Sequence, residues 1–158
     1  MYLKGDPMDS AKYVGVIGGG ECTDSTYKTA QSLGFEIGKK GWILVCGGLG
    51  GVMEAAAKGC AEAGGMTLGI LPGSKRNSAN PYIRIALPTG LGEGRNLLVV
   101  RTSDVLVSIA GGYGTLSEIA LALKAGKPVI GLETWEHIQG IQYVSHPDEV
   151  IEKIDRID

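Results

Sequence analysis

The stretch "VLVSIAGGYGTLSEIALALKAGKP", residues 105–128, decides the fold because it contains a complete strand, turn and helix. Val105–Ile109 is a nearly continuous apolar run, which indicates a strand covered on both faces of a sheet. Glycines crowd residues 110–114, and the amphipathic segment over Leu116–Ala125 ends at a glycine, as helices commonly do. A strand that runs through a glycine turn into a helix predicts one unit of a parallel α/β sheet.

The rest of the chain repeats this alternation of short apolar runs and amphipathic segments. The other predicted strands are Tyr13–Ile17, Trp42–Cys46, Thr67–Leu71, Ile83–Leu87, Val129–Leu132 and Gln142–Val144. The other predicted helices are Ser25–Lys40, Val52–Ala63, Arg95–Thr102 and Pro147–Ile157. We therefore expect one Rossmann-like α/β domain over residues 11–158, doubly wound, with a mainly parallel sheet and helices on both faces. Residues 1–10 are polar and contain Gly and Pro, which predicts a flexible N-terminal arm.

The composition restricts the class of partner. The 158 residues carry a formal net charge of −2, which argues against a general nucleic-acid binder. Between Met66 and Ser103 five cations stand against a single acid, and such a locally basic segment fits a small anionic ligand. Three cysteines without C-x-x-C spacing and two histidines predict reduced thiols and no metal site. No apolar run approaches about 20 residues, so we expect a cytoplasmic protein that does not bind membranes.

Glycine clusters follow three of the predicted strands, directly after Ile17, Cys46 and Ile109. The first cluster includes Gly19, and the second includes Gly47, Gly48 and Gly50. In open parallel sheets, ligands bind beyond the carboxyl ends of the strands, so these clusters mark the expected binding edge. Neither of the first two clusters completes the dinucleotide-binding motif G-x-G-x-x-G, and the second strand ends without the acidic residue that binds the ribose of NAD. The P-loop motif G-x-x-x-x-G-K-[ST] does not occur in the sequence. The clusters therefore disfavour NAD and a P-loop nucleotide.

The third cluster, Gly111, Gly112 and Gly114, carries the clearest indication of anion binding. It leaves a bare backbone at the end of a strand, and Thr115 is expected to open the next helix. Free N–H groups and the helix dipole at such a position bind phosphate without a lysine. An alternative is that Thr115 and Glu118 form a capping box, in which the glutamate only caps the helix. A capping box does not require three preceding glycines, which favours ligand contact.

Arg95 opens a second predicted helix, directly after the glycine-rich sequence "GLGEG". A cation at a helix N-terminus opposes the helix dipole, so it is well placed only if it faces a carboxylate or an anion. The alternative is an arginine that extends into solvent over apolar surface. Arg95 is therefore a second candidate ligand-binding residue.

Three motifs, taken in order, resemble one known family: "CGGLGGVMEAAAKGC", "GEGRNLLVVRTSDVLVSIAGGYGTLSEI" and "GKPVIGL". The family contains the cytokinin-activating LONELY GUY enzymes, which remove the base from nucleoside 5′-monophosphates, and carries the older label "possible lysine decarboxylase". The resemblance covers roughly residues 12–132. It places Glu118 and Arg95 on the family's catalytic glutamate and arginine. It also implies a phosphate-binding turn, formed by Gly111, Gly112, Gly114 and Thr115. A second glycine turn beside the nucleotide would be formed by Gly47, Gly48, Gly50 and Met53.

Two departures from the enzyme motif point to one branch of this family. Ala110 stands where the motif has proline, and the segment before Arg95 lacks the enzymes' Met and His, with Asn96 in place of lysine. In both respects the chain looks more like the branch that includes the molybdenum cofactor carrier protein, which binds a pterin phosphate. Nothing in the sequence marks a Schiff-base lysine, so lysine decarboxylation receives no support.

The sequence leaves three functions open. The resemblance favours a phosphoribohydrolase that cleaves the N-glycosidic bond of nucleoside 5′-monophosphates, with Glu118 stabilising an oxocarbenium-like transition state. The alternatives are a non-catalytic carrier of a pterin phosphate such as the molybdenum cofactor, and a nucleotide-sensing protein. In each case the partner is a small phosphorylated ligand, either a nucleotide or molybdopterin, and no further cofactor is required. The resemblance also implies a homodimer or a higher homo-oligomer.

Overall fold

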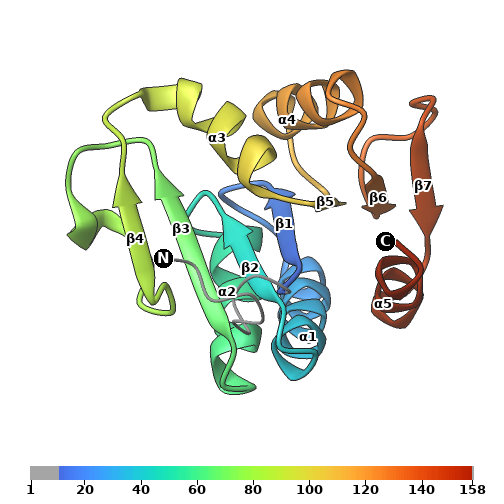
Figure 1. Ribbon diagram of the computed structural model, residues 1–158, viewed down its shortest axis with the longest axis horizontal. Helices are drawn as coiled ribbons and strands as arrows, with labels where there is room; N and C mark the ends of the chain where they lie inside the picture. Colours follow the sequence, from blue (N-terminus) through green and yellow to red (C-terminus); the bar gives the residue numbers. More distant parts are fainter. Residues whose placement is uncertain (1–10, 158) are drawn as a thin grey trace, which may run out of the picture.

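The computed structural model describes residues 11–157, and the predicted arm over residues 1–10 lies outside them. Its centre is a seven-stranded sheet in which every neighbouring pair of strands is parallel, in the order β4-β3-β2-β1-β5-β6-β7 (Figure 1). The strands are β1 Tyr13–Gly18, β2 Ile43–Cys46, β3 Met66–Leu71, β4 Ile85–Pro88, β5 Val105–Ile109, β6 Val129–Leu132 and β7 Ile141–Val144.

Helices cover both faces of this sheet, as predicted. They are α1 Asp24–Lys39, α2 Val52–Glu62, α3 Arg95–Thr102, α4 Tyr113–Lys124 and α5 Pro147–Asp155, with short 3-10 turns η1 Arg76–Ser78 and η2 Gly92–Gly94. One apolar cluster joins α1, α2 and α5 to one face, and a second joins α3 and α4 to the other (Figure 1). The predicted Rossmann-like, doubly wound α/β domain is therefore confirmed.

The strand order brings the three glycine clusters together. β1 pairs with β2 on one side and with β5 on the other, so the carboxyl ends of these three strands are neighbours. Helix α2 follows β2 on one face, whereas α4 follows β5 on the other face. The chain thus reverses its winding direction at β1, and such a reversal opens a crevice at the carboxyl edge of a sheet.

Two elements differ from the prediction in ways that matter for the site. Helix α4 begins at Tyr113, three residues before the predicted Leu116. Strand β4 begins at Ile85 rather than Ile83 and pairs only with β3, so the side chains of Ile85 and Leu87 are partly exposed. An edge strand is not covered as a central strand is, although its apolar sequence looks the same.

Close packing of α1 against α2 depends on two glycines. A Cβ atom at Gly59 of α2 would overlap the carbonyl oxygen of Gln31 on α1, and a Cβ at Gly34 of α1 would overlap the carbonyl oxygen of Ala56 on α2. Backbone atoms cannot move aside as flexible side chains do. The absence of these two side chains therefore sets the distance between the helices.

We expect Gly59→Ala to lower the free energy of unfolding by about 2 kcal/mol, because an overpacked helix contact forces the backbones apart. The effect exceeds the gain that alanine brings to a helix interior, which is about 1 kcal/mol. Urea unfolding followed by circular dichroism measures it. Gly73→Ala is the matched control, since a Cβ there meets no atom within 4 Å. Equal stabilities of the two variants would contradict the proposed close contact.

Within residues 11–157, no helix has the length and apolar character needed to cross a lipid bilayer.

Candidate functional site

A cavity of about 320 Å³ lies at the carboxyl edge of the sheet, where β1, β2 and β5 end. Its volume is in the range of small-molecule sites. The residues that line it come from the ends of these strands and from the first turns of three helices. They are Val16, Ile17, Gly18, Gly19, Gly20, Gly47, Leu49, Met53, Arg95, Asn96, Gly112, Gly114, Thr115 and Glu118.

Most of the site residues suggested by the sequence line this one cavity. Those that do are Gly19, Gly47, Met53, Arg95, Gly112, Gly114, Thr115 and Glu118. Gly48, Gly50 and Gly111 are not among the lining residues. Gly48 and Gly111 have φ values of 77° and 96°, and side chains at these positions would overlap Leu71 and Thr115. These two glycines are thus required by the turns themselves.

The N-terminus of α4 opens into the cavity without a side-chain cap. Its N-cap residue is Gly112, and no side chain accepts a hydrogen bond from the first turn. The first four N–H groups of an α-helix have no partner within the helix, and here they belong to residues 112–115. Thr115 is the third residue of the helix, so it does not form the capping box considered above. Glu118, one turn further along, instead faces the cavity.

The loop after β6 holds this glycine turn in place. The carbonyl of Glu133 accepts a hydrogen bond from the backbone N–H of Ala110 (2.9 Å), and Thr134 Oγ1 donates to the carbonyl of Ala110 (2.9 Å). Trp135 Nε1 donates to the carbonyl of Gly112 (3.1 Å). Sequence reasoning missed these residues, and their only signal was a tryptophan in a loop after a buried strand.

Ala110 itself has an unusual backbone conformation, with φ of 48°. Proline, whose φ is restricted to about −65°, cannot adopt this conformation. Ala110 therefore follows a backbone path that the proline of the enzyme motif cannot follow.

Arg95 is the first residue of α3, and its side chain crosses the edge of the sheet towards the end of β2. A Cβ atom at Gly47 would overlap its Nη1 atom and would lie 2.7 Å from Met53 Sδ. The residue is only 9% exposed, and its buried Nε atom has no hydrogen-bond partner among residues 11–157. Burial lowers the pKa of Arg95, whereas the nearby carboxyl of Glu118 raises it. A buried guanidinium group with an unused donor is a ready site for an anion.

Glu118 is 6% exposed and reaches the same cavity from α4. Burial raises its pKa to about 7, and the positive charge of Arg95 only partly opposes this effect. Within residues 11–157, no ion pair shorter than 4.0 Å joins Glu118 to Arg95. The two side chains therefore flank the cavity instead of closing it.

The variant Gly47→Ala tests whether the position of Arg95 matters. The added methyl group would take the space of the guanidinium tip, and this flexible tip can move without disturbing the fold. We expect an affinity for phosphorylated ligands about 10-fold lower or more, corresponding to at least one lost charge-assisted hydrogen bond. Isothermal titration calorimetry measures the affinity, and a wild-type melting temperature shows that the fold is intact. Unchanged affinity would contradict a ligand contact by Arg95.

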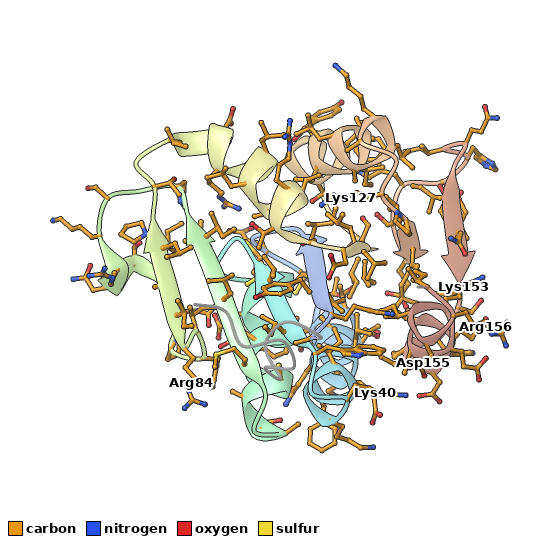
Figure 2. The ribbon with its side chains drawn as sticks, viewed as in Figure 1. Lys40, Arg84, Lys127, Lys153, Asp155 and Arg156 are labelled. Carbon is orange, nitrogen blue, oxygen red and sulfur yellow. The ribbon has the colours of Figure 1, made fainter. Side chains whose placement is uncertain are left out.

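Lys127 supports α3 from the loop that precedes β6 (Figure 2). Its Nζ donates to the carbonyls of Val100 (2.9 Å), Arg101 (3.0 Å) and Ser103 at the C-terminal end of α3. A cation at this end satisfies carbonyls that lack helical partners and favours the helix dipole. Lys127 thereby anchors the helix whose other end carries Arg95.

We expect Lys127→Met to lower the free energy of unfolding by about 1–2 kcal/mol. The reason is that three carbonyls at the C-terminal end of α3 lose their charged hydrogen-bond donor. Chemical unfolding measures the change. Lys28→Met serves as the control, because Lys28 is exposed on α1 and its replacement removes the same charge. Similar effects of the two substitutions would show that the three hydrogen bonds contribute little.

Within the described residues, His, Cys, Asp and Glu side chains do not gather in groups of three or more that could hold a metal ion.

Comparisons with known proteins agree with this fold. The model of the SLOG cluster4 family matches residues 11–156. The solved structure of the molybdenum cofactor binding protein from Rippkaea orientalis is similar, with a TM-score of 0.89 and 40% identity over 93% of this chain and 97% of that chain. The molybdenum cofactor carrier protein of Chlamydomonas reinhardtii superimposes with a TM-score of 0.84 and 34% identity over 93% of this chain and 98% of that chain.

A more distant similarity links the chain to an enzyme. The cytokinin riboside 5′-monophosphate phosphoribohydrolase of Mycobacterium tuberculosis is 30% identical over 125 residues, which cover 72% of this chain and 65% of the enzyme. The predicted relationship to LONELY GUY proteins is thus supported at the level of the family.

Proposed function

Because this chain belongs to the SLOG cluster4 family, we propose that it is a carrier protein that binds a phosphorylated pterin of the molybdenum cofactor type without hydrolysing it. The observation that carries this proposal is the cavity itself. The uncapped N-terminus of α4 and the partly unpaired, buried guanidinium of Arg95 both face it. Two sources of positive potential that lack protein partners are suited to hold a phosphate group.

The comparisons support a carrier more strongly than an enzyme. The two similar molybdenum cofactor proteins cover nearly all of this chain, at 40% and 34% identity. The φ of 48° at Ala110 also distinguishes the turn from the proline-containing enzyme motif. A carrier needs a phosphate anchor and an open cavity, and it needs no ionised carboxylate at the reacting bond.

Hydrolysis of nucleoside 5′-monophosphates is the second candidate function. One observation favours it: a buried carboxylate, Glu118, lies beside the cavity that would hold the phosphate. An ionised carboxylate near the ribose stabilises an oxocarbenium-like transition state. With a pKa of about 7, Glu118 is only partly ionised at neutral pH. Its activity in this role would therefore rise with pH through that value.

One experiment separates the two functions. The purified protein is incubated with a panel of nucleoside 5′-monophosphates, and released base is measured by chromatography. In parallel it is incubated with a molybdopterin source and analysed for bound pterin fluorescence and for molybdenum. We expect one pterin per chain and no released base. Base release that disappears in Glu118→Gln, together with no pterin binding, would establish the hydrolase instead.

The homo-oligomer expected from the resemblance remains a proposal. Leu98 on α3 is exposed, whereas its neighbours Val99 and Val100 belong to the core. An exposed apolar side chain at this place is suited to contact a second copy of the chain. Light scattering of the wild type and of Leu98→Ser tests whether it does.

A further inference from the structure

A second cavity of about 290 Å³ opens beside the first one, between the N-terminal turns of α3 and α4. The two cavities share Asn96 and Gly114, so they are adjacent. The second cavity is lined by Glu93, Gly94, Asn96, Leu97, Tyr113, Gly114, Ser117 and Leu121. We call it the α3–α4 groove.

The α3–α4 groove has the chemical make-up of a site for a flat ring. Leu97 and Leu121 supply apolar surface, and Tyr113 supplies an aromatic face. Polar groups for the edge of a ring come from Glu93 and Asn96. Binding sites for heterocycles typically combine apolar walls with a few polar groups that fix orientation.

Tyr113 is held in a position to stack on a ligand. It is the first residue of α4, directly beside the free amides, and it is 83% exposed. Its ring centroid lies 5.8 Å from that of Trp135, with an interplanar angle of 38°. Trp135 is in turn fixed by its hydrogen bond to the carbonyl of Gly112. A large aromatic side chain that is supported by its neighbour and yet exposed suits a stacking partner that arrives with the ligand.

Glu93 determines which kind of ring fits. Among the described residues that line the α3–α4 groove, it is the only one with a carboxylate. An ionised carboxylate only accepts hydrogen bonds, and its two oxygens match two adjacent N–H donors. A 2-amino-4-oxopyrimidine edge, found in guanine and in pterins, presents such a pair of donors. The corresponding edge of adenine pairs a donor with an acceptor and cannot satisfy both oxygens.

We propose that the α3–α4 groove is a heterocycle subsite that selects ligands with a 2-amino-4-oxopyrimidine edge, which stack on Tyr113 and donate hydrogen bonds to Glu93. This proposal rests on the proposed function, because it takes the phosphate to be anchored at the first cavity. It goes further in assigning ring selectivity to two residues outside that cavity. Asn96 lines both cavities.

Calorimetric titration with GMP, IMP, AMP and ribose 5-phosphate tests the subsite. IMP lacks only the 2-amino group, and ribose 5-phosphate lacks the whole ring. We expect GMP to bind about 10-fold more tightly than IMP, since one charge-assisted hydrogen bond is lost. GMP is expected to exceed ribose 5-phosphate by more than the roughly 5- to 150-fold that stacking of one base on an aromatic side chain contributes, since ribose 5-phosphate also lacks the hydrogen bonds to Glu93. Neopterin monophosphate, titrated in parallel, distinguishes a pterin from a guanine nucleotide as the better ligand.

Two variants test which residues cause these differences in affinity between the ligands. Tyr113→Ala is expected to weaken GMP binding about 10-fold while the affinity for ribose 5-phosphate stays unchanged. Glu93→Gln is expected to make GMP and IMP bind equally. Phe35→Ala is the control, because it removes an exposed aromatic ring from α1, on the opposite face of the sheet.

The outcomes separate the subsite from the phosphate anchor. If ribose 5-phosphate binds and GMP, IMP and AMP bind no more tightly, the subsite is refuted and the anchor stands. If GMP binds in a manner that depends on Glu93 while ribose 5-phosphate and inorganic phosphate do not bind, the subsite stands and the phosphate anchor fails. Binding of none of these ligands, nor of neopterin monophosphate, refutes both.

Discussion

Replacing Arg95 by methionine is expected to abolish binding of phosphorylated ligands while leaving the protein at least as stable as the wild type. Truncating one partner of a buried, hydrogen-bonded charge pair costs about 2–5 kcal/mol, which corresponds to a loss of affinity of roughly 30- to 4,000-fold. Burial of the Arg95 charge costs more than its attraction to Glu118 returns, because burial lowers the pKa of Arg95 overall and no residue among 11–157 accepts a hydrogen bond from its buried Nε atom. Methionine replaces most of the apolar part of the arginine side chain, so packing at this position is largely preserved.

Titration with ribose 5-phosphate and thermal unfolding of the same samples measure the two effects of Arg95→Met. Arg101→Met is the control, because Arg101 lies on the same helix, is exposed and does not line the first cavity. A variant that loses stability as well as affinity would show that Arg95 is mainly a structural residue. Retained affinity would remove the basis for the phosphate anchor.

Glu118→Gln is expected to stabilise the folded protein, and to do so more at high pH than at low pH. Burial raises the pKa of Glu118 from 4.5 to about 7 in the folded state. Between these two values the folded chain holds a proton that the unfolded chain has released, so stability falls as pH rises. The wild type reaches the full penalty above pH 7, whereas glutamine has no charge to bury.

The size of this effect follows from the shift. One pKa unit corresponds to about 1.4 kcal/mol, so the advantage of Glu118→Gln should grow by about 2–3 kcal/mol between pH 5 and pH 8. Comparing the two pH values cancels differences in packing between glutamate and glutamine. Urea unfolding at both pH values measures the growth, with Glu152→Gln as the control, an exposed position on α5. An advantage that does not depend on pH would mean that Glu118 titrates normally.

Glu118 also makes the two candidate functions distinguishable by pH. In a hydrolase, the turnover rate should rise with pH until Glu118 is ionised, near pH 7, and then level off. In a carrier, the same ionisation places a negative charge beside the bound anion, so affinity should fall over that range unless Glu118 is replaced. Ionisation of Glu118 should therefore raise the turnover rate of a hydrolase but lower the ligand affinity of a carrier.

Much of this architecture was predictable from local patterns. Nearly continuous apolar runs such as Val105–Ile109 identified strands that are buried on both faces, and Gly126 correctly marked a helix end. The start of α4 was predicted three residues too late, because glycine and tyrosine at 112–114 are poor indicators of a helix. The structure forms the helix there all the same, with Trp135 bonded to the carbonyl of Gly112.

The glycines show where local patterns stop being informative. Glycine clusters predicted the binding edge, yet Gly47 lines the cavity whereas Gly48 and Gly111 do not. Sequence alone cannot separate a glycine that faces the cavity from one that only packs against a neighbour, because that neighbour can come from a distant part of the chain, as Leu71 does for Gly48. The α3–α4 groove is an example, since residues 93–97 and 113–121 meet there only after folding.

The sequence by itself determined the α/β class and the binding edge of the sheet, which follow from periodicity and turn residues that act over a few positions. The resemblance of its motifs to a known family singled out the pair Arg95 and Glu118. Only the tertiary structure decided that Arg95 and Glu118 are buried beside one cavity without forming an ion pair, and that Glu118 therefore titrates near neutral pH. Burial and charge separation depend on how α3 and α4 pack across the sheet, and no local stretch of sequence encodes that distance.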